Sequence, residues 1–117
     1  MHDHSLYPDT SKELAQKRRE LAPETYGAFR TFSQRVFADG ALPSKTKQLI
    51  AVAVAHATQC PYCIRGHTEL ALQTGATEQE IMEAIWVASE MRAGAAYAHA
   101  ALAIDTMNRF KEEKPAG

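Results

Sequence analysis

The sequence has little net charge and no long apolar run. Its formal charge is -1 over 117 residues, which gives no electrostatic reason to expect nucleic acid or an anionic membrane as a partner. The longest mostly apolar run, residues 49–57, is broken by His56 and is too short to span a bilayer. Residues 1–5 are polar and do not begin a signal peptide. We therefore expect a cytoplasmic protein.

Cysteine is also scarce. The chain has two, Cys60 and Cys63, separated by two residues, and His67 follows four positions after the second. In the reducing cytoplasm a close cysteine pair is more often a metal or redox site than a structural crosslink. This segment is the first candidate for a functional site.

Strand-like segments are also lacking, whereas helical spacing of apolar residues runs through most of the chain. Proline, glycine and capping residues divide it into six predicted helices. They cover 11–21, a second from 23 that ends at 39–40, a third from 43 to about 58, a fourth over 60–73, a fifth that begins at 77 and a last over roughly 92–110. The predicted fold class is all-α, with about six helices. The predicted domain organisation is an N-terminal tail and short helix over 1–22, a helical domain over 23–112 and a polar tail over 113–117.

Two of these helices carry specific expectations about packing. The second has an aromatic and aliphatic stripe that we predict to be core, formed by Tyr26, Phe29, Phe32, Val36 and Phe37. The last is crowded with alanine, which suits close packing within or between subunits. Within it, we expect His99 to be a core or interface histidine rather than a catalytic one.

A helix that begins at Cys60 places both sulfurs in its first turn. The unpaired amides and the positive end of the helix dipole favour an anion there, so this position favours a thiolate. His67 lies one turn after Cys63 on the same face and can accept the thiol proton. Such an arrangement is typical of a dithiol that cycles with a disulfide.

Two other interpretations of the same residues remain open. His56, Cys60, Cys63 and His67 are all potential zinc ligands, although on one continuous helix they would spread over roughly 16 Å. Alternatively, both cysteines are buried as small apolar side chains. His56 could also line the pocket of the cysteine pair or serve only in packing.

Three segments together resemble the carboxymuconolactone decarboxylase superfamily, namely 46–55, 59–68 and 75–84. Within it, the cysteine pair resembles the alkylhydroperoxidase D-like branch, and the resemblance covers roughly residues 23–105. It implies an all-helical fold that assembles as a homotrimer or homohexamer. It also implies thiol-dependent reduction of a peroxide or disulfide, with a lipoyl or thioredoxin-like thiol reductant as a partner.

The resemblance assigns roles to individual residues. Cys63 would attack the substrate, Cys60 would resolve the intermediate, and His67 would be the base; the Cys60–Cys63 disulfide would replace any separate cofactor. Gln48, however, stands where peroxidase members carry a glutamate that feeds a proton relay, and an amide cannot exchange a proton near neutral pH. Tyr62 replaces a histidine between the cysteines.

These departures keep further interpretations in view. A carboxylate could come from another helix, for which Glu69, Glu83 and Glu90 are the candidates. The decarboxylase branch would instead act on a small lactone acid, but it does not use this cysteine pair. A non-catalytic module that senses redox state or binds a metal is the third class.

Overall fold

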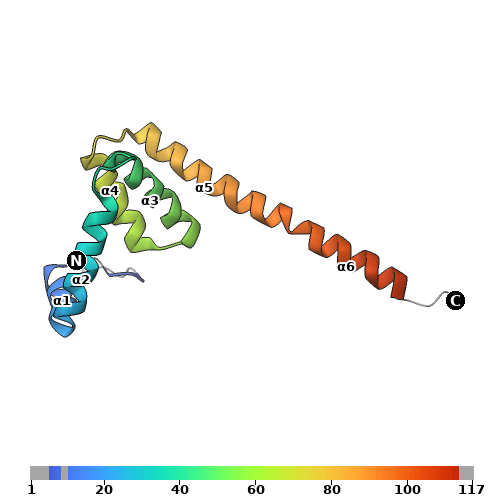
Figure 1. Cartoon of the computed structure of the whole chain (residues 1–117), viewed down its shortest axis with the longest axis horizontal. Coiled ribbons are helices and arrows are strands. Elements are labelled where there is room, and N and C mark those ends of the chain that lie inside the picture. The colour runs from blue at the N-terminus through green and yellow to red at the C-terminus, as the bar shows by residue number, and fades with distance from the viewer. Residues whose placement is uncertain (1–5, 9–10, 114–117) are drawn as a thin grey trace.

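The computed structural model describes residues 6–8 and 11–113, and within these ranges the regular structure is all helix, joined by short turns and loops, with no strand. Figure 1 shows the six helices in order. They are α1 (Lys12–Leu21), α2 (Pro23–Phe37), α3 (Ser44–Thr58), α4 (Pro61–Gln73), α5 (Glu78–Ala98) and α6 (Ala100–Glu113). The all-α prediction is confirmed.

Several helix starts form for the reasons that the sequence indicates. The Ser11 hydroxyl accepts a hydrogen bond from the Leu14 amide at 3.1 Å and caps α1. Thr77 and Glu80 form a complete capping box at the start of α5, with the Glu80 amide donating to the Thr77 hydroxyl and the Thr77 amide to the Glu80 carboxylate. Pro23 occupies the first turn of α2.

The buried core lies where α3, α4 and the first half of α5 meet. It consists of Val52, Ala71, Ala76 and Ile81, with Leu49 and Ile85 packed against it. Gly75, with φ of +95°, makes the turn that brings α5 back over α3. An ion pair of 2.8 Å between Lys45 and Glu80 joins the starts of α3 and α5.

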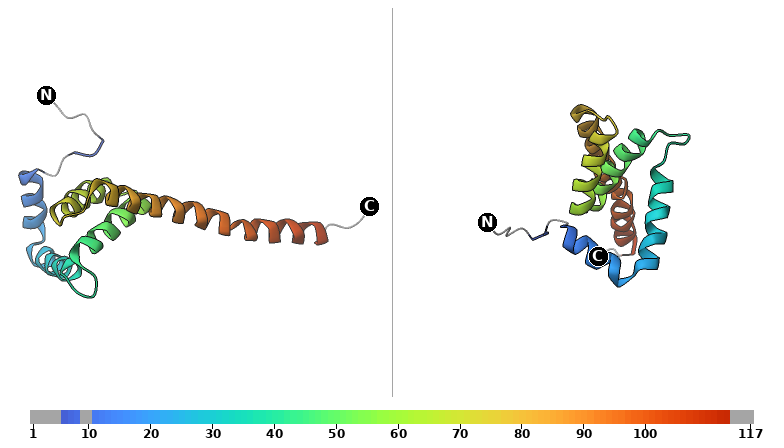
Figure 2. Two further views of the ribbon diagram at one scale, coloured as in Figure 1. Left: turned by 90° about the horizontal axis from the view of Figure 1, so that it is seen from above. Right: turned by 90° about the vertical axis from the view of Figure 1, so that its left-hand side faces the viewer.

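Beyond this core, α5 and α6 continue as one rod that leaves the other helices behind (Figures 1 and 2). We call residues 91–113 the arm. The molecule is 70 Å long, and its radius of gyration is 21.2 Å, against roughly 13 Å for a compact domain of about this size. The Arg92 guanidinium donates to the Ala57 carbonyl of α3 at 3.1 Å, and beyond this contact no described helix lies beside the arm.

The predicted boundary between the last two helices at residue 92 is wrong. Helix α5 continues to Ala98, and the interruption falls at His99, whose amide bonds to the Ala95 carbonyl. Met91 and Arg92 are good helix formers, so the sequence there contains nothing that would end a helix.

The prediction that the aromatic stripe of α2 is core is also wrong for the single chain. No residue of α2 is buried; Phe29 and Phe32 are 65% and 63% exposed. The stripe has the expected helical spacing, but within this chain α2 has little more than the start of α3 to pack against (Figure 2).

Parts of the predicted tails lie outside the described residues, namely 1–5 and 9–10 of the N-terminal segment and 114–117 of the C-terminal one. No helix in the described ranges combines the length and the apolar character needed to cross a membrane.

Candidate active site

The site is built on a tight reversal between α3 and α4. Helix α3 ends at Thr58, and its C-cap residue Gln59 adopts the left-handed conformation with φ of 55°. The Cys60 amide then donates to the Ala55 carbonyl at 3.0 Å, so that α4 returns alongside α3. Two residues thus suffice to lay the two helices side by side.

Cys60 is the N-cap of α4 and Cys63 lies in its first turn, as the sequence predicts. The two are joined by a disulfide, with their Cα atoms 5.2 Å apart. The Cys60 sulfur also accepts a hydrogen bond from the Cys63 amide at 3.3 Å. The amides of a first turn favour negative charge, so they stabilise a thiolate when the pair is reduced.

His67 is held by residues from two other helices. Its Nδ1 lies 2.8 Å from the side-chain oxygen of Gln48 on α3, and its ring stacks on Phe37 of α2, with centroids 5.1 Å apart. Burial lowers the pKa of His67 from its ordinary value of 6.5. The site therefore combines α2, α3 and α4 around one imidazole.

Two cavities reach the site from different sides. The first, of about 420 Å³, follows one stripe of α3 from Lys47 to Thr58, and the second, of about 410 Å³, lies between α2 and α4. Both are mostly apolar, and both are lined by Val36, Phe37, Cys63 and His67. A substrate in either cavity would meet Cys63 and His67 together, whereas Cys60 lines neither.

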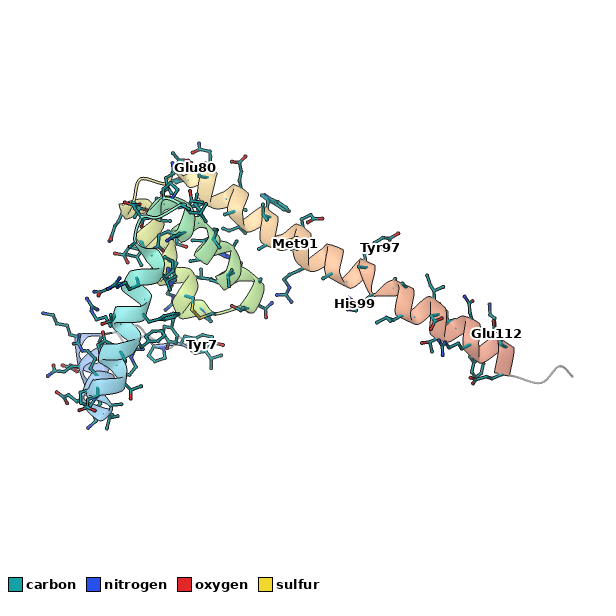
Figure 3. The ribbon with its side chains drawn as sticks, viewed as in Figure 1. Tyr7, Glu80, Met91, Tyr97, His99 and Glu112 are labelled. Carbon is teal, nitrogen blue, oxygen red and sulfur yellow. A yellow bond between two sulfur atoms is a disulfide. The ribbon has the colours of Figure 1, made fainter. Side chains whose placement is uncertain are left out.

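The remaining candidates lie at varying distances from this centre. Tyr62 is 43% exposed and lines the second cavity, and its ring packs edge to face with that of Tyr7, with centroids 6.0 Å apart. His56 is half-buried, bonds through Nδ1 to the Val52 carbonyl at 2.8 Å and lines neither cavity. His99 lies exposed in the arm, far from the cysteines (Figure 3).

None of the three candidate carboxylates lines either cavity. Glu69, Glu83 and Glu90 are exposed. The part of the chain that the structure describes contains no group of three or more histidine, cysteine or acidic side chains placed to hold a metal ion.

Sequence reasoning did not anticipate that Phe37 and Lys47 belong to the site. The α2 stripe predicts Phe37 to be core, and local spacing predicts no role for Lys47. Each acts through a contact between helices: Phe37 stacks on a residue 30 positions later, and Lys47 donates to the Ala38 carbonyl at 2.7 Å while lining the first cavity. Local spacing contains no signal for such contacts.

Comparisons with known proteins agree on one family. The sequence pattern of the carboxymuconolactone decarboxylase family matches residues 23–106. "Uncharacterized protein 4 in cox locus" of Paracoccus denitrificans is 65% identical over 103 residues, which cover 88% of this chain and 92% of the relative.

Two solved structures extend the likeness to the fold. A carboxymuconolactone decarboxylase family protein from Legionella pneumophila is 38% identical with a TM-score of 0.65, covering 82% of this chain and 86% of its own. Another family member, from Thermotoga maritima, with a suggested part in the antioxidative response, is 27% identical with a TM-score of 0.56, covering 76% and 92%. The chain described here belongs to the carboxymuconolactone decarboxylase family.

Proposed function

We propose that the protein is a thiol-dependent oxidoreductase of the alkylhydroperoxidase D-like type, which reduces a hydroperoxide or a disulfide through the Cys60–Cys63 pair. The observation that carries the proposal is the disulfide at the start of α4, with one of its sulfurs and a histidine on the walls of two apolar cavities. The family relative with a suggested part in the antioxidative response also supports a thiol-dependent oxidoreductase.

Cavity access supports Cys63 as the attacking residue. Cys63 lines both cavities and Cys60 lines neither. With a hydroperoxide, Cys63 loses its proton and its sulfur attacks one peroxide oxygen. The O–O bond breaks, the proton passes to the leaving alkoxide, and a sulfenic acid and an alcohol form. The Cys60 thiol then attacks the sulfenic sulfur, which releases water and forms the disulfide.

An external dithiol completes the cycle by exchange. Its thiolate attacks the disulfide, its second thiol resolves the mixed disulfide, and the reductant leaves oxidised. A lipoyl or thioredoxin-like dithiol has the required chemistry. With a disulfide substrate the Cys63 thiolate attacks sulfur instead, and Cys60 releases the second product thiol. Such a cycle needs no cofactor and suits the reducing cytoplasm.

Two matched substitutions test the mechanism. Turnover of cumene hydroperoxide with dithiothreitol as reductant should disappear in Cys63→Ser, because the attacking sulfur is gone. Cys60→Ser should still form the sulfenic acid, which dimedone traps at Cys63 for mass spectrometry. Full turnover in Cys63→Ser would overturn the mechanism, and trapping at Cys60 would reverse the two roles. A reversible disulfide without turnover of any peroxide or disulfide would indicate a redox sensor.

We also propose that the working protein is a homo-oligomer. Within one chain large apolar side chains stay exposed along α2 and the arm, among them Phe29, Phe32, Met91, Leu102 and Phe110. Exposed apolar surface of this extent on a soluble protein normally marks an interaction site. A trimer or hexamer is the expected assembly. Light scattering should give a multiple of the chain mass of 12.9 kDa, and a monomer at micromolar concentration would contradict it.

A further inference from the structure

Gln48 is the one polar side chain that is buried in the described part of the chain, with 4% of its surface exposed. A buried amide must find hydrogen-bond partners, and its oxygen bonds to His67 Nδ1 at 2.8 Å. Because an amide oxygen can only accept, the proton of this bond belongs to Nδ1. Gln48 thereby selects one of the two neutral forms of the imidazole.

The selected form leaves Nε2 with its lone pair. Gln48 bonds to one edge of the ring and Phe37 stacks on one face, so the imidazole cannot turn without losing the bond to Gln48. The ring and Cys63 line the same two cavities. The basic nitrogen is therefore the one left available to the thiol and to a substrate.

The surroundings do not favour a positively charged His67. The ionisable side chains that line the two cavities beside it are Lys47 from α3 and Tyr62 and Cys63 from α4, while α2 adds apolar side chains and the Ser33 hydroxyl. No described carboxylate lines either cavity. Burial lowers the pKa of His67, and Gln48 brings no negative charge that would offset this lowering.

We propose that Gln48 is a positioning residue that holds His67 neutral with its proton on Nδ1, so that Nε2 removes the Cys63 proton only as attack occurs. A glutamate at this position would instead favour a standing thiolate–imidazolium pair. The inference rests on the proposed function in one respect, that Cys63 attacks. The proton passes from Cys63 Sγ to His67 Nε2 and then to the leaving alkoxide of the hydroperoxide, which departs as the alcohol.

The first test reads the tautomer directly. Long-range ¹H–¹⁵N spectra of the reduced, histidine-labelled protein distinguish a protonated Nδ1 from a protonated Nε2. His56 and His99 serve as internal standards. Their Nδ1 atoms lie 2.8 and 2.7 Å from backbone carbonyl oxygens. A carbonyl oxygen can only accept, so both histidines carry a proton on Nδ1. His67 should match both standards, and Gln48→Leu should remove the match. A protonated Nε2 on His67 in the wild type would overturn the proposal.

The second test reads the thiol. Cys60→Ser leaves Cys63 as the single thiol, so its rate of alkylation by iodoacetamide can be followed against pH. Adding Gln48→Glu should move the pH midpoint down by about one unit or more, which is roughly a tenfold faster reaction near pH 6.5. Identical profiles in folded proteins would overturn the proposal. Neither readout depends on turnover, so failure here is distinguishable from failure of the proposed peroxide chemistry.

Discussion

The two ends of the molecule use the same kinds of apolar residue with opposite results. At the packed end, Val52 and Ala71 are fully buried between α3 and α4. In the arm, Tyr97 and Leu102 are 83% and 65% exposed, and Figure 3 shows Tyr97 projecting from the rod where no other described helix lies beside it. An apolar stripe thus predicts that a face will be covered, but it does not say by which chain.

The candidate site lies between the buried core and the exposed helix α2. Gln48 is buried beside the core, while Phe37 lies at the end of α2, where Phe29 and Phe32 remain exposed. One side of the site is therefore complete within the chain. The other side depends on a surface that the single chain leaves uncovered, which is the physical reason to expect assembly to affect the cavities.

The strongest test of the contrast uses two valines of one helix. Val52→Asp would bury a carboxylate at a position with 0% exposure, and we expect it to abolish cooperative unfolding of the packed end. Val54→Asp is the matched control, because Val54 lies on the same helix and is 53% exposed. Circular dichroism during thermal unfolding measures both. Equal loss of structure in the two variants would show that the core is not where the single chain places it.

The second test concerns the arm. The double variant Leu102→Glu with Phe110→Glu puts charge on two side chains that are 65% and 63% exposed in the chain. If a second copy covers the arm, light scattering should show a lower mass while the helices persist. Glu112→Lys is the control, since it changes charge in the same helix without touching the apolar face. An unchanged mass in the double variant would exclude the arm from the interface.

Much of this contrast is readable from the sequence, because local rules govern it. Thr77 and Glu80 predict the start of α5, and Pro61 predicts that Cys60 opens α4; both predictions are confirmed. Gln48 entered the candidate site only through the family resemblance. Its bond to His67 joins residues 19 positions apart on different helices, and no local periodicity encodes that contact.

The exposure of the α2 stripe within the single chain could not be predicted, for the same reason. Helical spacing identified the stripe that contains Phe29 and Phe32 but assigned it to the core of its own chain. Periodicity identifies the apolar face of a helix. It does not identify the surface that covers this face, which depends on how the whole protein packs or assembles. The stacking of Phe37 on His67 was missed alongside it.

A smaller effect should separate the two helix caps. Thr77→Ala removes a cap at the packed end and should cost about 1 kcal/mol in the free energy of unfolding. Ser11→Ala removes an equivalent bond from α1, which contacts only α2. There we expect fraying of α1 with little change in global unfolding. Urea denaturation measures both, and equal costs would mean that α1 unfolds together with the core.

The smallest expected effect is the dependence of stability on pH that His67 adds. Burial lowers its pKa below the ordinary 6.5, so just below that pH the unfolded chain binds a proton that the folded chain does not. Stability is therefore highest above pH 6.5 and falls only slightly as the pH drops toward the lowered value, because His67 is only half-buried and solvent screens it. His67→Phe should lose this slope between pH 7 and pH 5 even though it unpairs Gln48 at every pH. Parallel urea curves for the two proteins would mean that the packed end does not hold His67 neutral.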